Sequence, residues 1–523
     1  MSIIAWKTIN WAQVEFRVRR YQTRIYKASR DNNKYKVRRL QKRLLCSLDA
    51  KLMAVKRVTT GINKKIFVTD NQKGKLVQKL RLDGKALPSR PVYTNKPGKK
   101  NKRRPLTLST SIIEDRAKQF LCLLVLESEW EARFEQNSYG FRPGRSCHDA
   151  IESIFINLRN ISGDRGFHKY ILYFSINKCF DKIDYNYLMT KLETISKIES
   201  QVKVWLKSDI FKEYEANKLG HISESIKCIA QGDIIFPLLI NIVFHGMENY
   251  LKDWIYNKLS FRKINKCSKN TELKSLAVIR YINDLVIIHK EKSIIQEAKG
   301  KIAKWLLDGP RVEINEAKIS ILHSNEGFDF LGFSIITIMC GRSRIKIYPS
   351  RKSQFTLLFK VQNIIRNNSS VSSYNLILKL RSVIIGWAHY FRFSECQKVF
   401  HKLTLLIHQK LRAWVFRRDT RNGKMKVKQH YFPNGKSYIY EGIWYQDNWV
   451  LTGKQFDKDG IIKEVWLPHI VWIKNKKWVK IEADKSPFDS DNIYWAKRTL
   501  NMRNWSIRQG KFIIIKRQNG YCK

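Results

Sequence analysis

The chain has 523 residues, 43% of them hydrophobic, so it can bury a large core and divide into about three or four domains. Lys and Arg number 99 against 45 Asp and Glu, which gives a formal net charge of +54. The hydrophobic content excludes a disordered chain, and the charge predicts a polyanionic partner. The 15 Trp, 22 Tyr and 26 Phe among these cations favour RNA, which proteins bind by phosphate contacts and base stacking together.

The nine cysteines are odd in number and widely spaced, with no Cys-x-x-Cys pair. This predicts a reducing compartment, with neither a zinc site nor a disulfide framework. The longest apolar runs, such as 120–126, are too short to span a bilayer, so no membrane partner is expected. The first residues have neither a signal-peptide nor a transit-peptide pattern, so we expect the protein to work where it is made.

Residues 1–84 are expected to form a helical N-terminal extension. Apolar residues recur at helical spacing from Trp11 to Ile25 and from Val37 to Leu52, with Arg and Lys on the opposite faces. Those charged faces are either solvated surfaces or RNA contacts, and the sequence leaves both open. From 61 to 82 the periodicity weakens, which predicts a loop or linker.

A dense basic stretch follows, in which a Lys-Pro-Gly-Lys-Lys turn would present several cations to phosphates. Its candidate RNA contacts are Lys96, Lys99, Lys100, Arg103 and Arg104. Residues 112–130 have the pattern of a core helix. The Gly- and Pro-rich loop after it carries two further candidate RNA contacts, Arg142 and Arg145, ahead of a helix near Ser146. His148 is expected to be packed, because no nucleophile or carboxylate partner is recognisable beside it.

Residues 276–289 consist of two apolar, β-branched runs on either side of Asn283 and Asp284. This pattern predicts a β-hairpin with a carboxylate at its tip. Taken alone, such a polar pair is ordinary turn chemistry, so its meaning depends on the surrounding sequence.

Five segments occur in the order and approximate spacing of a group II intron reverse transcriptase/maturase: GFRPGRSCHDAI, YFSINKCFDKID, AQGDIIFPLLINIVFHGMENYL, RYINDLVIIH and GFDFLGF. The chain resembles the cyanobacterial and plastid lineage of that family over nearly its whole length. The resemblance implies an α+β, right-hand reverse-transcriptase fold. It places fingers and palm in 85–340, an α-helical thumb (maturase domain X) in 341–425, and a small basic, DNA-binding-like remnant in 426–523.

In the family, three aspartates hold two Mg²⁺ ions that clamp the attacking and leaving oxygens of nucleotide addition. The resemblance places these positions at Ser175, Asn283 and Asp284, so only Asp284 is a carboxylate. One carboxylate cannot neutralise two divalent ions, so we expect the metal pair and polymerase activity to be lost, with no cofactor bound. Asp181, beyond the turn after Ser175, is expected to be structural.

Other departures from the family agree with this expectation. The family's Pro-Gln-Gly-Gly loop reads Ala-Gln-Gly-Asp at 230–233, which puts a charged side chain where close backbone approach is expected. Phe236 replaces the family's Ser before Pro237. Apolar character is nevertheless kept at Leu238 and Ile242, which indicates a fold retained for binding.

Residues 354–418 are expected to be helices, with aromatic residues at helical spacing in their core. Their candidate phosphate contacts are Lys398, Lys402, Lys410, Arg412, Arg417 and Arg418. Alternating aromatics from Tyr438 to Trp449 predict β structure. In the family this region leads to a DNA-binding segment and often an HNH endonuclease. Residues 485–489 and 516–522 resemble the approach to that nuclease, but no second cysteine follows, so no metal nuclease is expected.

The resemblance implies a maturase that binds group II intron RNA and assists its folding and splicing, as a monomer or homodimer with weak DNA binding. Two alternatives stay open: an active reverse transcriptase with an atypical metal site, and a general RNA-binding or chaperone protein. A composition rich in Lys, Ile and Asn fits a low-GC genome. Together with this, the resemblance to the cyanobacterial and plastid lineage implies the chloroplast as the expected location, with a mitochondrion or a low-GC bacterium as alternatives.

Overall fold

The computed structural model describes residues 6–60, 69–86, 90–92, 108–110, 113–159, 169–176, 183–206, 234–261, 275–312, 319–340, 342–456 and 460–504. These residues fall into two compact units. The first lies within 1–154, 169–321 and 481–495, and the second within 155–168, 322–480 and 496–523. None of the described helices combines the length and apolar character that crossing a bilayer requires.

The first unit begins with a short 3₁₀ turn, η1 (Trp6–Thr8), and four helices: α1 (Trp11–Arg30), α2 (Lys34–Cys46), α3 (Leu48–Thr59) and α4 (Asp70–Lys79). Each helix starts after a polar side chain that accepts a backbone N–H, the usual N-cap arrangement. The helices predicted up to residue 60 are confirmed. The loop predicted for 61–82 is wrong at α4, where Thr69 and Gln72 form a capping box and Val77 is buried.

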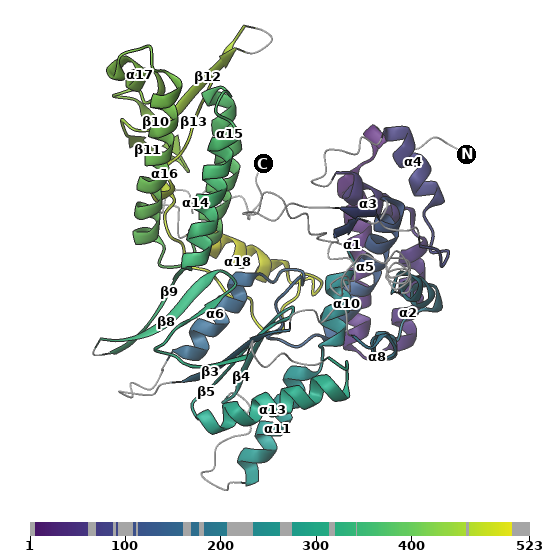
Figure 1. Ribbon diagram of the computed structural model, residues 1–523. Helices are drawn as coiled ribbons and strands as arrows, with labels where there is room; N and C mark the ends of the chain where they lie inside the picture. The colour runs from purple at the N-terminus through teal and green to yellow at the C-terminus, as the bar shows by residue number, and fades with distance from the viewer. Residues whose placement is uncertain are drawn as a thin grey trace, which may run out of the picture. The chain divides into compact units, whose positions relative to one another are not determined.

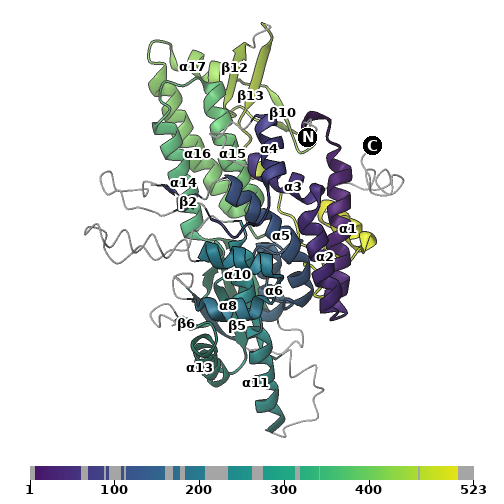
Figure 2. The same cartoon turned by 90° about the vertical axis from the view of Figure 1, so that its right-hand side faces the viewer.

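Helix α5 (Ile113–Arg133) packs against α1, α2 and α3, and Figures 1 and 2 show the four helices together. Its inner face buries Leu121, Val125 and Trp130, which confirms the predicted core helix. The helix predicted near Ser146 is α6 (Cys147–Leu158). Two short helices, α8 (Tyr185–Leu192) and α10 (Phe236–Val243), pack on each other, and α10 also contacts α5.

The sheet of the first unit has the strand order β4-β5-β3-β6. Its strands are β3 (Tyr170–Ser175), β4 (Ala277–Tyr281), β5 (Asp284–His289) and β6 (Ile319–His323), and both β3 and β4 run antiparallel to β5. Helix α13 (Lys292–Asp308) covers β3 and β5, and α11 (Met247–Phe261) packs on α13. The predicted hairpin is confirmed. A separate antiparallel pair is formed by β1 (Arg90–Val92) and β2 (Leu108–Thr110).

The second unit starts with an antiparallel sheet of β7 (Phe328–Phe330), β8 (Phe333–Cys340) and β9 (Arg342–Pro349). Leu331 and Gly332 make the turn between β7 and β8, both with positive φ. Helices α14 (Arg351–Arg366), α15 (Ser373–Phe391) and α16 (Gln397–Arg418) then lie side by side, followed by α17 (Lys424–Tyr431) (Figures 1 and 2). The helices predicted for 354–418 are confirmed.

Two hairpins follow α17 in this unit. One joins β10 (Ser437–Tyr440) to β11 (Ile443–Gln446), and the other joins β12 (Thr452–Phe456) to β13 (Ile462–Trp466). They confirm the β structure predicted from the alternating aromatics, although Trp449 lies outside the strands. A 3₁₀ turn, η3 (Ile470–Trp472), and helix α18 (Asn492–Asn504) follow. The described residues combine antiparallel sheets with packed helices, which confirms the expected α+β class.

Candidate functional site

The β4–β5 hairpin brings Asp284 directly opposite Ser175 at the end of β3. The backbone N–H of Ile176 donates to the Asn283 carbonyl at 2.9 Å, and Asn283 Nδ2 donates to the Ile176 carbonyl at 3.3 Å. All three positions that the resemblance equates with the metal-binding aspartates therefore lie together. The Asn283 amide is already held by the backbone at the end of β3.

Burial raises the pKa of the Asp284 carboxyl, and a hydrogen bond from the Ser175 hydroxyl opposes that rise. Asp184 caps α8 by accepting the Asn186 N–H at 2.8 Å, so its carboxylate has a structural use. Within the described ranges no group of three or more His, Cys, Asp or Glu side chains could hold a metal ion. One carboxylate with a neutral hydroxyl and a neutral amide does not fit a Mg²⁺ pair. Asp181 and the loop at 230–233 lie outside the described residues.

Arg280, one residue before the end of β4, supports the hairpin through side-chain hydrogen bonds. It was not singled out from the sequence. Its guanidinium donates to Ser138 Oγ at 2.7 Å, Asn241 Oδ1 at 3.0 Å and the Ile282 carbonyl at 3.1 Å. Burial lowers its pKa to about 10, so the side chain stays charged at neutral pH. An arginine inside an apolar strand was the available signal, because a buried cation needs a built set of acceptors.

The turn of the hairpin is held by a close contact with the preceding loop. Ile282 has φ +58°, a conformation that a β-branched residue rarely adopts. A Cβ on Gly140 would come within 2.4 Å of Ile282 Cγ1 and 2.8 Å of the Ile282 nitrogen. Asn241 Nδ2 also donates to the Gly140 carbonyl at 2.8 Å. Gly140 is therefore required for the loop to approach the turn.

The structure buries Arg142, which the sequence had suggested as an RNA contact. It is 5% exposed, and it forms a two-pronged ion pair with Glu131 at 2.8 Å for each contact. Its Nη1 donates to the carbonyls of Glu135 and Ser138 at 2.6 and 2.7 Å. Four of the five N–H groups are thus used within the protein, so the buried Arg142 side chain fixes the loop after α5.

The structure also buries the side chain of Arg145, the other RNA contact predicted in this loop. Only 3% of its side chain is exposed, and its Nη1 and Nη2 donate to the carbonyls of Gln136 and Ala483, each at 2.9 Å. Burial and the neighbouring Arg142 guanidinium lower its pKa. Both arginines were predicted from their Gly- and Pro-rich surroundings, which do not reveal partners distant in sequence.

Residues 481–495, called here the C-terminal strap, pack against the helices at the start of the chain. Phe488 is 2% exposed, with its ring 6.3 Å from the Tyr26 ring and 4.9 Å from the Arg19 guanidinium. Arg19 Nη2 donates to the Pro487 carbonyl. The Ile481 N–H donates to the fully buried Asp149 carboxylate at 2.8 Å. The strap is thus an integral part of the first unit.

The predicted phosphate contacts of α16 differ in accessibility. Lys398, Lys402 and Arg417 are exposed, without an acidic partner among the described residues. Lys410 donates to Gln362 Oε1 at 3.2 Å, and Arg418 donates to two backbone carbonyls, those of Ser369 and Val371.

Arg412 is exposed, with its guanidinium 5.7 Å from the Phe416 ring. The five cations predicted in the basic stretch, Lys96, Lys99, Lys100, Arg103 and Arg104, lie outside the described residues.

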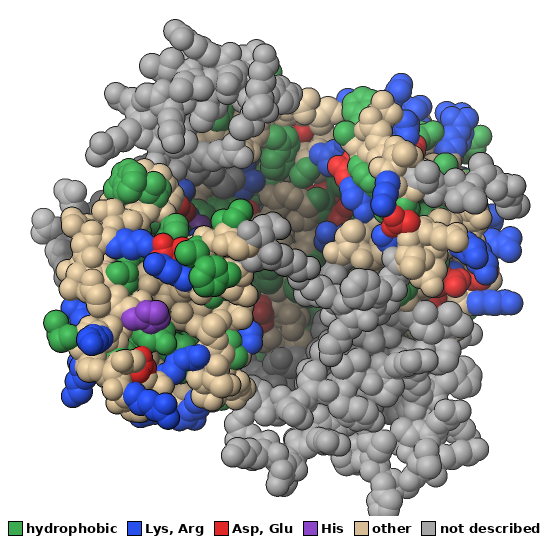
Figure 3. All heavy atoms as spheres, turned by 90° about the horizontal axis from the view of Figure 1, so that it is seen from above, with side chains coloured by type: hydrophobic (Ala, Val, Ile, Leu, Met, Phe, Trp, Pro, Cys, Tyr) green, Lys and Arg blue, Asp and Glu red, His purple; other side chains and the backbone are tan. Residues whose placement is uncertain are grey.

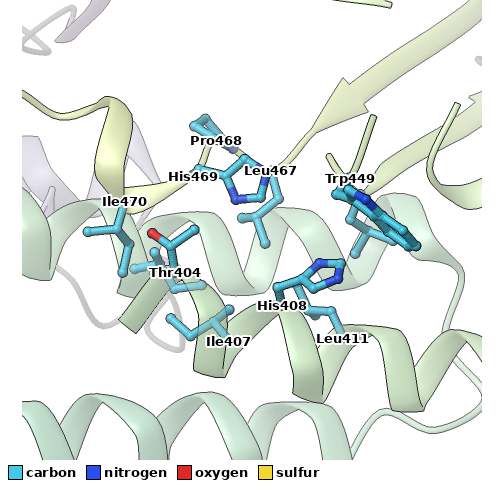
Figure 4. A pocket seen from close by; sticks show the side chains of 11 residues that line it. Thr404, Ile407, His408, Leu411, Trp449, Leu467, Pro468, His469 and Ile470 are labelled. Atoms are coloured by element: carbon cyan, nitrogen blue, oxygen red, sulfur yellow. The ribbon is translucent and has the colours of Figure 1, made fainter. Parts of the chain in front are cut away.

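A small cavity lies between α16 and the segment before η3 (Figure 4). His408 and His469 both point toward it, and each has a buried ring nitrogen without a hydrogen-bond partner. His469 Nε2 is 3.5 Å from Asp447 Oδ2. Burial lowers the pKa of both histidines, which favours their neutral forms.

Helices α1 and α2 carry a strongly basic surface. The sequence left open whether these charged helix faces are solvated or contact RNA. Exposed cations without an acidic partner among the described residues occur on both helices, and we call six of them the α1–α2 basic face: Arg20, Arg24, Lys27, Arg39, Lys42 and Arg43. Phe16 and Tyr35, which are 68% and 79% exposed, lie on the same two helices. Figure 3 shows Lys and Arg side chains spread over the described surface seen from above.

Three family models match the chain. Residues 6–80 match the N-terminal domain of reverse transcriptase, 94–335 match reverse transcriptase (RNA-dependent DNA polymerase), and 356–432 match the group II intron, maturase-specific domain. Among solved structures, the chain is similar to telomerase from Candida albicans in complex with a fragment of telomeric RNA, with 12% sequence identity. That match covers 60% of this chain and 55% of the telomerase chain, with a TM-score of 0.28.

Protein YkfC of Escherichia coli is 30% identical over 270 residues, which are 48% of this chain and 67% of that protein. Maturase-like protein 1 of Euglena gracilis is 26% identical over 392 residues, covering 73% of this chain and 76% of the relative. The group II intron-encoded protein LtrA of Lactococcus lactis is 26% identical over 311 residues, about half of each chain. The chain has the reverse-transcriptase fold and belongs to the group II intron reverse transcriptase/maturase family.

Proposed function

We propose that this protein is a maturase that binds group II intron RNA and assists its folding and splicing, without polymerising nucleotides. The observation that carries the proposal is the composition of the Asp284 site within an otherwise intact fold. Ser175 faces Asp284 across the sheet, and the Asn283 amide is held by the Ile176 carbonyl. The fold is kept while the donors for two metal ions are reduced to one carboxylate.

The RNA-binding part of the proposal is supported by the α1–α2 basic face and by the exposed cations of α16. Packed RNA helices repel each other through their phosphates, and cations held on a rigid protein surface offset that repulsion. Splicing chemistry would belong to the RNA in this account. The protein would contribute positive charge and stacking surfaces.

We also propose that the protein acts in the compartment that transcribes its target intron. For a chain of this composition and lineage resemblance, the chloroplast is the first candidate.

The assembly proposed is a monomer or homodimer. The domain boundaries at 84, 340 and 425 likewise stay predictions.

Primer extension tests the catalytic part of the proposal. Purified full-length protein is given a primed RNA template, deoxynucleotides and Mg²⁺, with an active group II intron reverse transcriptase as the positive control. We expect no templated incorporation, because a single carboxylate cannot hold both ions of the reaction. Incorporation by the unchanged protein would establish the rival account, an active polymerase with an unorthodox metal site.

Neutralising the α1–α2 basic face tests the RNA-binding part. The variant Arg20→Gln/Arg24→Gln/Arg39→Gln is compared with Lys56→Gln/Lys73→Gln/Lys203→Gln, whose lysines already pair with Glu15, Asp70 and Glu199. If all three arginines contact phosphates, the salt dependence of intron binding falls by about two units of slope in the first variant. A slope unchanged by the first variant, or reduced equally by both, would remove this face from the interface.

A further inference from the structure

Helix α14 presents a stripe of basic and aromatic side chains on its outer face. Positions spaced three and four residues apart share one side of a helix. The side opposite the buried Leu357 and Val361 carries Lys352, Phe355, Phe359, Asn363 and Arg366, called here the α14 stripe. Lys352 and Arg366 are exposed at its two ends. The stripe spans about 21 Å along the helix.

Phe355 is unusual because 70% of it is exposed. Its ring lies 6.4 Å from the Phe359 ring, centroid to centroid, with the planes only 17° apart. The two rings are thus nearly parallel, and Phe355 still has most of its surface open to solvent. Aromatic surface on this side of α14 is therefore open to solvent.

The charge around the ring pair has a single sign. Helix α14 contains no Asp or Glu. Its exposed cations Arg351, Lys352, Lys360 and Arg366 have no acidic partner among the described residues. An apolar protein partner gains nothing from these cations, whereas a nucleic acid offers phosphates to the cations and base faces to the rings.

We propose that the α14 stripe is a stacking platform for unpaired RNA nucleotides, with Phe355 and Phe359 receiving bases and Lys352 and Arg366 contacting the flanking phosphates. The inference rests on the proposed function, since it specifies which part of a bound RNA this surface takes. Bases inside a duplex already stack on each other, so only loops, bulges and single strands can use the platform.

The test measures binding of the full-length protein to a labelled single-stranded RNA of about 12 nucleotides and to a duplex of the same sequence. The variants are Phe355→Ala, which removes the ring, and Phe355→Trp, which keeps an aromatic face. Phe456→Ala is the control, because Phe456 is a 71% exposed aromatic side chain on β12 of the same unit.

We expect Phe355→Ala to weaken single-strand binding about tenfold, the loss of one base stack, and to leave duplex binding within about twofold. Phe355→Trp should bind as the unchanged protein does, and so should Phe456→Ala. Equal losses on both RNAs would overturn the platform, as would single-strand affinity unchanged by Phe355→Ala. A change confined to self-association, measured by sedimentation, would instead identify a protein-binding surface and also overturn it. Absence of RNA binding by the unchanged protein would refute the proposed function itself.

Discussion

At the scale of single residues, the hairpin that carries Asp284 depends on neighbours that have no catalytic chemistry. Arg280 supplies three donors behind the turn, and Gly140 allows the loop to approach it. Such arrangements are sensitive to small additions of volume, because the atoms around them are already in contact.

The substitution Gly140→Ala should lower the free energy of unfolding by about 1 to 3 kcal/mol, since the new methyl group would overlap the Ile282 side chain and nitrogen. Gly300→Ala is the matched control, because that glycine is on α13 with nothing within 4 Å of the added Cβ. The control should be neutral or stabilising by up to about 1 kcal/mol. Urea unfolding measures both, and similar values for the two variants would contradict the close contact.

Glu127 predicts a pH dependence for the first unit. Burial raises its pKa to about 7, neighbouring Glu131 adds to the rise, and Arg19 opposes it. Between about pH 4.5 and 7 the folded state therefore binds more protons than the unfolded chain. Its contribution to the free energy of unfolding falls as pH rises through this window and is level above it.

The variant Glu127→Gln should accordingly be more stable than the unchanged protein by about 1 to 2 kcal/mol at pH 8, with the difference shrinking toward pH 5. Glu15→Gln is the control, because the Glu15 side chain is 55% exposed and pairs at the surface. Thermal unfolding across the pH range gives both curves. A Glu127→Gln curve parallel to that of the unchanged protein would show that Glu127 titrates normally.

At the scale of elements, the C-terminal strap is the least expected feature. The sequence resemblance assigned its residues to the approach to a nuclease, yet Phe488 is packed beside Tyr26 of α1. The strap also reaches the loop behind the hairpin through Asp149 and Arg145. The C-terminal strap and the first helix of the chain therefore stabilise the same unit.

The substitution Phe488→Ala should lower the free energy of unfolding by about 3 to 5 kcal/mol, because the ring that it removes is almost fully buried. Ile493→Ala in the same strap should change it by less than about 0.5 kcal/mol, since Ile493 is 82% exposed. Hydrogen exchange of the α1 amides reports the effect on the first unit. Equal exchange in the two variants would mean that the strap is not part of that unit.

Elements with strong local patterns could be predicted from the sequence, as α1, α5 and the β4–β5 hairpin illustrate. Helix α4 was missed because its capping box spans only Thr69 to Gln72 and its apolar stripe is short. The burial of Arg142 and Arg145 depends on Glu131 and Ala483, which the chain brings together only on folding. The strap belongs to the same class of long-range contact, which local periodicity does not encode.

At the scale of the whole molecule, the net charge of +54 and the family membership both favour RNA as the partner. Some of the described acids hold the fold, as Glu131, Asp149 and Glu129 show through their hydrogen bonds to other parts of the chain. Many of the described cations are exposed with no acidic partner in the described ranges. A surface of this kind binds RNA with an affinity that falls steeply with salt.

The most direct test of the central claim is crosslinking of the protein to RNA in its source cells, followed by immunoprecipitation and sequencing. The account predicts that one group II intron dominates the bound RNA, with crosslinked peptides from the α1–α2 basic face, α14 and α16. Bound RNA dispersed over many transcripts would contradict a specific maturase and establish a general RNA-binding protein in its place.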